Sequence, residues 1–286
     1  PYDYTDDDQT RKIKPVQDEI ITEFLKVPYE EVSITSHDGL KLTGRYYHVT
    51  DGAPLEIQCH GYKGNALRDF SGAKRIARAA GRNVLLINQR CHGGSEGRTI
   101  TFGILERRDL LCWVDYAIER FGADVTIFLY GVSMGGATVL MASDLELPKN
   151  VKAIIADCPF TKPLDVILHV GKTTAFPQWL IKPFAILGAR IYGSFDLLET
   201  DAIRAVQNAK VPVLIIHGED DRYVPCEMSA EATSISSLMS MTETKKYTKA
   251  RIRRAIWNTY FGVTSSDVRM LPVYTQVLAM DTVGMS

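Results

Sequence analysis

A serine held between glycines stands at residues 131–135, where the chain reads Gly-Val-Ser-Met-Gly. The segment follows an apolar, strand-like run and precedes a run of small and apolar residues that is typical of a helix. Glycines permit a sharp strand-to-helix turn, and such a turn lifts a serine hydroxyl clear of the backbone. The context favours Ser133 as a nucleophile over the alternative, a Ser/Gly turn with only a packing role.

A serine nucleophile needs hydrogen-bond donors for the oxyanion that forms when it attacks a carbonyl carbon. The backbone N–H of Met134, at the predicted helix start, is one candidate donor. In the G-x-S-x-G arrangement a second donor comes from the loop after an earlier strand. His60, Gly61 and Tyr62 follow the apolar run at 55–59. We therefore expect the N–H of Tyr62 as the second donor and a structural role for His60.

An acidic residue should follow a later strand and orient the catalytic base. The sequence HGEDDRYVP at 217–225 follows the apolar run at 211–216 and offers two aspartates. Asp221 lies deeper in this loop and is the expected acid. Asp220, closer to the strand end, is the alternative.

The base itself, a histidine, should come after the acid in chain order. The chain has six histidines, and none follows Asp221: they stand at positions 37, 48, 60, 92, 169 and 217. His169 remains an alternative base, although chain order disfavours it. A serine hydroxyl is a weak nucleophile without a neighbour that takes its proton. The sequence therefore predicts slow hydrolysis even of activated esters.

The elements around these residues alternate between apolar runs and helical periodicity. Residues 12–26 have helical spacing, and residues 30–49 read as a β-hairpin with its turn at 37–39. Continuous Val/Ile/Leu runs then predict parallel strands, with helices that cover both faces of the sheet. The predicted strands are 55–59, 83–89, 125–131, 151–157 and 211–218, and the predicted helices are 66–80, 103–120 and 135–144.

Residues 159–205 interrupt this alternation with an apolar, proline-broken segment. It is long for a simple crossover connection, so we expect helices that form a lid over the carboxyl edge of the sheet. Phe176, Trp179 and Phe184 in this segment suit an acyl or aromatic group, and packing of the lid core explains them equally well.

Four stretches together resemble the α/β-hydrolase family, and within it the bacterial serine-aminopeptidase-like and esterase-like members: HGYKGN (60–65), NQRCHGGSEGRTITFG (88–103), GVSMGG (131–136) and HGEDDRYVP (217–225). The resemblance covers about residues 28–235. It implies an eight-stranded, mostly parallel sheet and acyl transfer to water through an acyl-enzyme at Ser133. His92 belongs to a turn motif of the family and has no base role there.

The end of the chain departs from this pattern. A cluster of lysines and arginines at 245–254 precedes an amphipathic stretch and a strand-like run, VYTQVLAM. This tail resembles part of the bacterial tRNA(Met) cytidine acetate ligases, whose nucleotide-binding core is absent here. We expect three parts: a helical lead-in (1–27), a hydrolase domain (28–237) and a foreign tail (238–286). A chimera in which the last strand and histidine were replaced is favoured over a native appendage, because the tail breaks the consistency of the pattern upstream.

The bulk composition excludes several classes of protein. The net charge is −1 with 23% charged residues, so overall electrostatic attraction does not favour binding to nucleic acid or to an anionic membrane. No apolar run has membrane-spanning length, and the first residues do not resemble a signal peptide. The five cysteines have no metal-site spacing and are expected as buried free thiols of a cytoplasmic protein. We expect no cofactor, no metal and no membrane partner, with a small ester or amide as substrate. The alternatives are a non-catalytic binding protein of the same fold and a tRNA-contacting fragment.

Overall fold

The computed structural model describes residues 8–64, 80–172 and 176–217, and eleven positions outside these ranges: 67, 69, 70, 77, 221, 224, 225, 227–229 and 232. The predicted helix at 66–80 lies largely outside the described residues, as do Asp220 and the whole tail at 238–286. The elements are α1 (Asp8–Leu25), β1 (Glu30–Thr35), β2 (Lys41–Tyr47), β3 (Leu55–Cys59), β4 (Asn83–Ile87), α3 (Glu106–Phe121), β5 (Ile127–Val132), α4 (Met134–Ala142), β6 (Val151–Asp157), α5 (Pro163–Gly171), α6 (Gln178–Ile191), α7 (Ala202–Gln207) and β7 (Val213–Ile216).

The described strands form one seven-stranded sheet in the order β1-β2-β4-β3-β5-β6-β7. The first two strands are antiparallel to each other, and β2 is antiparallel to β4, whereas the remaining pairs are parallel. The predicted hairpin and the mostly parallel sheet are therefore confirmed. Of the eight strands that the family resemblance implies, the described residues supply seven, and β7 stands at one end of their order.

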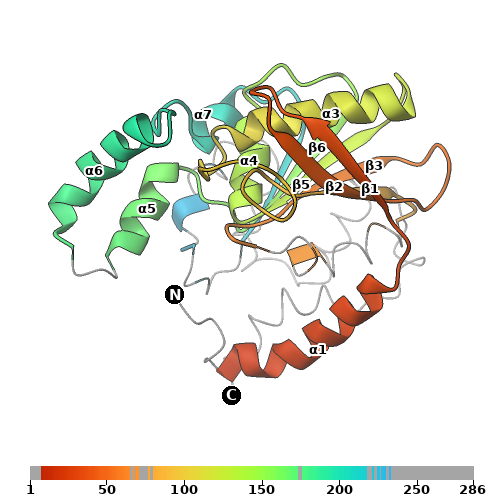
Figure 1. Cartoon of the computed structure of the whole chain (residues 1–286), viewed down its shortest axis with the longest axis horizontal. Helices are drawn as coiled ribbons and strands as arrows, with labels where there is room; N and C mark the ends of the chain where they lie inside the picture. The colour runs from red at the N-terminus through yellow and green to blue at the C-terminus, as the bar shows by residue number, and fades with distance from the viewer. Residues whose placement is uncertain are drawn as a thin grey trace, which may run out of the picture.

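Alternate side chains of each central strand enter different hydrophobic layers, as the period of two in a strand requires. On β4, Leu85 and Ile87 pack in the layer that contains Trp113 of α3 and Leu140 of α4. Val84 and Leu86 of the same strand pack in the opposite layer with Phe24 of α1. Figure 1 shows α3 and α4 on one side of the sheet and α1 on the other. Helices on both faces bury both sides of the strands, which explains their uninterrupted apolar sequences.

The segment predicted as a lid contains α5, α6 and α7. The short helix α7 packs against α4, whereas α5 and α6 pack against each other and extend away from the sheet (Figure 1). A small separate cluster around Leu164, Ala189 and Leu197 holds this pair together and includes Ile104 from the loop before α3. The segment is thus more than a crossover connection.

The four described cysteines differ in burial. Cys59 is buried, and burial raises the pKa of its thiol, while Cys91, Cys112 and Cys158 are partly exposed; all four are free. The expectation of buried free thiols thus holds fully only for Cys59, and Cys226 lies outside the described residues. Among the described helices, none combines the length and apolarity needed to cross a bilayer.

Candidate active site

Ser133 occupies a sharp turn between β5 and α4. Its backbone has φ 54° and ψ −116°, a left-handed value of φ that is rare for a residue with a side chain. The N–H of Ser133 donates a hydrogen bond of 2.8 Å to the carbonyl oxygen of Asp157, and its own carbonyl accepts from Ala137 N–H at 3.0 Å. These two bonds hold the strained residue at the strand end, where its side chain is partly exposed.

The glycines around Ser133 are required by close approach of backbone segments. A Cβ atom on Gly135 would overlap the carbonyl oxygen of Cys59, and one on Gly131 would overlap the carbonyl oxygen of Gly135. On the other side, a Cβ on Gly61 would lie 3.3 Å from Cβ of Ser133. The glycine pattern therefore lets α4 begin directly against the end of β3.

The two candidate oxyanion donors lie on either side of this turn. Met134 is the first residue of α4, so its N–H points out of the helix N-terminus. Tyr62 follows Gly61, where an added Cβ would lie only 3.3 Å from Cβ of Ser133. Neither amide has a hydrogen-bond acceptor among the described residues. The structure thus brings Ser133, Met134 and the backbone before Tyr62 together.

Two buried histidines fix the loop that carries Tyr62. His60 Nδ1 lies 2.8 Å from the carbonyl oxygen of Gly61, and its Nε2 accepts a hydrogen bond from Gln89 N–H at 3.1 Å. His92 Nδ1 lies 2.8 Å from the carbonyl oxygen of Arg90, and its Nε2 accepts from Lys63 N–H at 3.0 Å. Because a carbonyl only accepts and a backbone N–H only donates, both rings are neutral with the proton on Nδ1. The expectation that His60 and His92 are structural fits this geometry.

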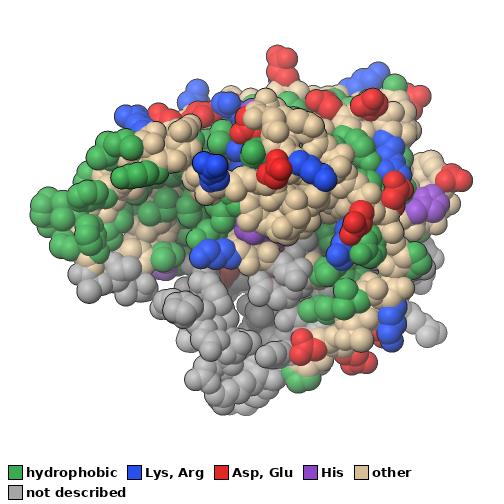
Figure 2. Space-filling model, in the orientation of Figure 1, with side chains coloured by type: hydrophobic (Ala, Val, Ile, Leu, Met, Phe, Trp, Pro, Cys, Tyr) green, Lys and Arg blue, Asp and Glu red, His purple; other side chains and the backbone are tan. Residues whose placement is uncertain are grey.

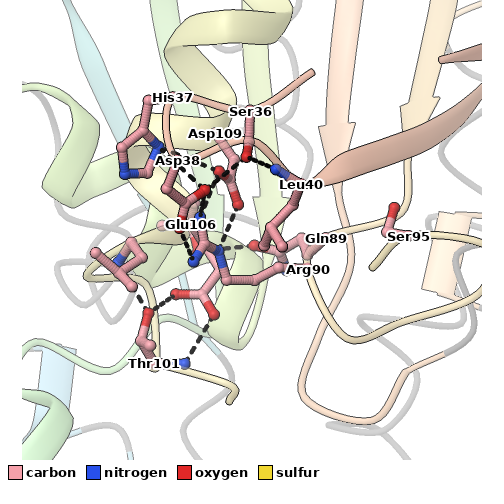
Figure 3. A network of polar contacts seen from close by, with 12 residues as sticks. Ser36, His37, Asp38, Leu40, Gln89, Arg90, Ser95, Thr101, Glu106 and Asp109 are labelled. Carbon is pink, nitrogen blue, oxygen red and sulfur yellow. Dashed lines mark hydrogen bonds and ion pairs between the residues drawn. The ribbon is translucent and has the colours of Figure 1, made fainter. Parts of the chain in front are cut away.

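The loop after β4 is in turn anchored by an ion-pair network (Figure 3). Arg90 donates two hydrogen bonds of 2.7 Å to the buried carboxylate of Asp109 on α3, and two more to Asp38 in the β1–β2 turn. Figure 3 shows Arg90 between these carboxylates, with Gln89 beside it. His37 Nδ1 lies 3.5 Å from Asp109. Burial raises the pKa of Asp109 even though Arg90 opposes the shift.

Asp221 lies in the loop after β7, and its carboxylate is used locally. Its Oδ1 accepts a hydrogen bond of 3.0 Å from Val224 N–H, and its Oδ2 lies 3.6 Å from Nε2 of His217. His217 Nε2 donates to the carbonyl oxygen of Val224 at 2.7 Å, so Nδ1 is free to accept from the Ser229 hydroxyl at 2.7 Å. Both ring nitrogens of His217 are therefore engaged, and its side chain is 4% exposed.

Asp157 adds a second carboxylate beside this loop. Burial raises its pKa above the ordinary value of 3.8, and hydrogen bonds from Cys158 and Tyr130 together with nearby His217 only partly oppose this shift. Nothing in the sequence motif distinguished Asp157. The position was visible only as the end of a predicted strand, and its carbonyl contact with Ser133 depends on strand register.

The remaining histidines lie elsewhere. His37 is in the Arg90 network, and His48 is an exposed neighbour of Tyr46 and Asp51. His169 is in the last turn of α5, which packs against α6. None of the chain's six histidines therefore stands between Ser133 and Asp221 in a hydrogen-bonded triad among the described residues.

Within the described part of the chain, two clusters of three side chains bring metal-ligating atoms within 4.8 Å of one another. In the first, Cys158, His217 and Asp221, both imidazole nitrogens already have hydrogen-bond partners. In the second, the guanidinium of Arg90 already supplies the positive charge between two aspartates. Neither arrangement argues for a bound cation.

Comparison with protein families gives two matches along the chain. Residues 57–195 match the family described as alpha/beta hydrolase fold. Residues 222–286 match the family described as HIGH nucleotidyl transferase. The second match begins directly after Asp221, so it includes the tail distinguished in the sequence.

Individual relatives and solved structures agree with the first match. The chain is 27% identical over 249 residues to the uncharacterized protein YqkD of Bacillus subtilis, covering 86% of this chain and 78% of that protein. It is 34% identical over 136 residues to the thiohydrolase aneE of Aspergillus aculeatus, covering 46% and 42%. The Pyrococcus furiosus esterase Pf2001 superposes with a TM-score of 0.59 at 24% identity, covering 75% of this chain and 80% of the esterase. The esterase Est1E of Butyrivibrio proteoclasticus gives 0.55 at 23%, covering 71% and 85%. At these identities the solved structures show the fold alone.

Proposed function

Because the chain belongs to the α/β-hydrolase superfamily, we propose that its site is built to hydrolyse an ester or amide through an acyl-enzyme at Ser133. The observation that carries this proposal is the strained backbone of Ser133 at the β5–α4 turn, with the N–H of Met134 beside it. Such strain persists only where the surrounding structure over-determines it, and it gathers at active sites.

The proposed reaction begins when Ser133 Oγ attacks the substrate carbonyl carbon. The carbonyl oxygen becomes an oxyanion that accepts hydrogen bonds from Met134 N–H and Tyr62 N–H. The intermediate then expels the alcohol or amine, which must gain a proton, and water later releases the acyl group. In the family arrangement a histidine oriented by the acid, here Asp221, moves these protons.

We further propose that this proton transfer is impaired in the present chain. Support comes from the match to a different family from residue 222 onward, where the hydrolase pattern calls for a histidine. His60 and His217 are engaged through both ring nitrogens, and so is His92. In a serine protease that lacks a triad member, the residual acceleration is about 10³–10⁴ over water. The match of residues 222–286 to a different family also favours a chimera over a native appendage as the origin of residues 238–286.

A fluorophosphonate probe tests both parts of the proposal on the full chain. We expect slow labelling over hours, confined to Ser133 by peptide mapping and absent from Ser133→Ala. Rapid stoichiometric labelling of Ser133 would contradict the impairment but retain the nucleophile. Labelling elsewhere would contradict the assignment of Ser133 as the nucleophile. No labelling at all would also contradict it and would favour a non-catalytic binding protein.

The tail offers no second activity of its own. The HIGH-type signature requires histidines, and residues 222–286 contain none. Only the basic cluster at 245–254 supports the alternative that this chain contacts RNA. Salt-dependent tRNA binding that is lost when Arg251, Arg253 and Arg254 become Ala would favour RNA contact, and no binding at low salt would exclude it.

A further inference from the structure

Seven of the eleven large apolar side chains that the described residues expose lie on or directly beside α5 and α6. Six of them form what we call the lid patch: Phe176, Trp179, Phe184, Leu187, Ile191 and Tyr192. The exposed fractions reach 77% for Trp179 and 88% for Tyr192. Figure 2 shows an apolar surface gathered over α5 and α6 at the left end of the molecule. Single exposed apolar residues need no explanation, whereas a contiguous patch marks an interaction surface.

The lid patch is not the face by which α6 packs on its neighbours. Ala185, Ile186 and Ala189 turn toward α5 and the Leu164–Leu197 cluster. Phe184, Leu187 and Ile191 follow at helical spacing on the outer side. Helix α6 is thus apolar on two faces: one packs on the Leu164–Leu197 cluster, and on the other Phe184 contacts only the ring of Phe176 among the described aromatic side chains, at 5.9 Å. A helix of this kind is normally buried or in contact with lipid.

Positive charges outnumber negative ones around the lid patch, and Asp165 and Asp196 border it. Residues 166–195 contain no Asp or Glu, although the chain has 34 acidic residues among 286. The same stretch contains Lys172, Lys182 and Arg190. Arg190 pairs with Asp196 at 3.2 Å, whereas the two exposed lysines have no ion pair with any described residue. The near-neutral charge of the whole chain conceals this local excess.

We propose that the lid patch docks on an anionic lipid surface. Trp and Tyr side chains beside Lys and Arg are typical of helices that lie in the headgroup region of a bilayer. Lysine stems lie along apolar surface while their ammonium groups reach the phosphates. This proposal is independent of the hydrolysis at Ser133, and it replaces the expectation of no membrane partner, which considered only spanning segments and overall charge.

The same charge pattern disfavours a second copy of the chain as the occupant. A two-fold dimer through this face would place the same surface on both sides. Lys172 and Lys182 of one copy would then lie near those of the other, without an acid from residues 166–195 to compensate. An anionic lipid surface removes this repulsion, and each lysine near it raises the partition coefficient about fivefold.

Vesicle co-sedimentation of the full chain tests the proposal. The vesicles contain either phosphatidylcholine alone or phosphatidylcholine with about one third phosphatidylserine, a composition chosen to make the surface anionic. We expect binding to the anionic vesicles that weakens with salt. Replacing Lys172 and Lys182 by Gln should lower the partition coefficient about 25-fold. Trp179→Glu with Ile191→Glu should abolish binding, and both sites are exposed enough for the variant to fold.

Leu25→Glu is the control. Leu25 is an aliphatic side chain that is 56% exposed, close to the 62% of Ile191, but it lies on α1, outside the lid patch. This control should bind vesicles like the unchanged chain, and circular dichroism verifies that each variant is folded. Equal binding to both vesicle types, no binding, or binding that survives the Trp179/Ile191 variant would overturn the proposal. So would a concentration-dependent dimer that this variant abolishes, since the lid patch would then join two copies.

Discussion

Gly135 lies so close to the carbonyl oxygen of Cys59 that no side chain can stand between α4 and the end of β3. This contact joins the helix after Ser133 to the strand that leads into the Tyr62 loop. The two segments that carry the proposed oxyanion donors are therefore in fixed positions relative to each other, before any substrate binds.

Gly135→Ala should consequently be strongly destabilising. The added methyl overlaps backbone atoms that cannot rotate away, so we expect a loss of about 2–4 kcal/mol in the free energy of unfolding. Urea denaturation measures it. Gly188→Ala is the control, since nothing lies within 4 Å of its Cβ position and it is inside α6. That variant should be neutral or stabilise by up to about 1 kcal/mol, and equal losses in both variants would contradict the steric argument.

Arg90→Met should lower the free energy of unfolding more than the removal of a surface arginine does. The substitution leaves the buried carboxylate of Asp109 without its partner, and breaking a buried pair costs about 3–5 kcal/mol. Arg190→Met breaks the exposed pair with Asp196 and should cost less than about 1 kcal/mol. Chemical denaturation of both variants gives the comparison, and a smaller loss for Arg90 than for Arg190 would refute the anchoring role.

Asp38 should make the free energy of unfolding depend on pH in the acidic range. Burial alone would raise the pKa of Asp38, but hydrogen bonds from Ser36 and Arg90 outweigh it and hold the pKa below its ordinary value of 3.8. A lowered folded pKa means that the stabilisation is complete above 3.8 and is lost as pH falls through the folded pKa. Since Asp38 is partly exposed, the effect should be about 1 kcal/mol or less.

Melting temperatures of the unchanged chain and Asp38→Asn, measured from pH 7 down to about pH 3, check this prediction. The difference between them should be constant at neutral pH and should shrink below about pH 4. A difference that persists unchanged into acid would mean that Asn disturbs packing instead of removing a charge.

The pH dependence of ester hydrolysis reports directly on the missing base. If no imidazole takes the Ser133 proton, turnover of p-nitrophenyl acetate should rise steadily with pH and show no plateau above about 6.5, the ordinary pKa of histidine. A plateau that His169→Gln removes would instead show that the α5 histidine reaches Ser133. Ser133→Ala supplies the baseline for both outcomes.

Much of the fold could be predicted from the sequence because helices cover both faces of the sheet. Runs such as 55–59 and 151–157 became β3 and β6 with the predicted bounds, since a strand buried on both faces is apolar throughout. The sharp turn at Ser133 could be predicted because the close approach of backbone segments there requires glycines.

Other features depend on contacts between distant residues, which a single sequence does not show. Arg90 and Asp109 are separated by a loop and the start of α3, and their pairing follows only from the packed structure. The outward direction of Phe176, Trp179 and Phe184 was equally hidden, because an apolar helix offers no polar face to mark the solvent side. Trp179 is 77% exposed, so packing in the lid core does not explain it, whereas the rings of Phe176 and Phe184 lie edge to face at 5.9 Å.

The separate cluster that holds α5 and α6 together makes this pair an interchangeable module. Among the described residues, Ile104 joins that cluster from the loop before α3, and Val166 of α5 packs against the main layer. Mutations on the outer side of α6 are therefore expected to be nearly additive with mutations in the sheet. Selection, or an engineer, can redesign what this part of the surface contacts without having to rebuild the site at the strand ends.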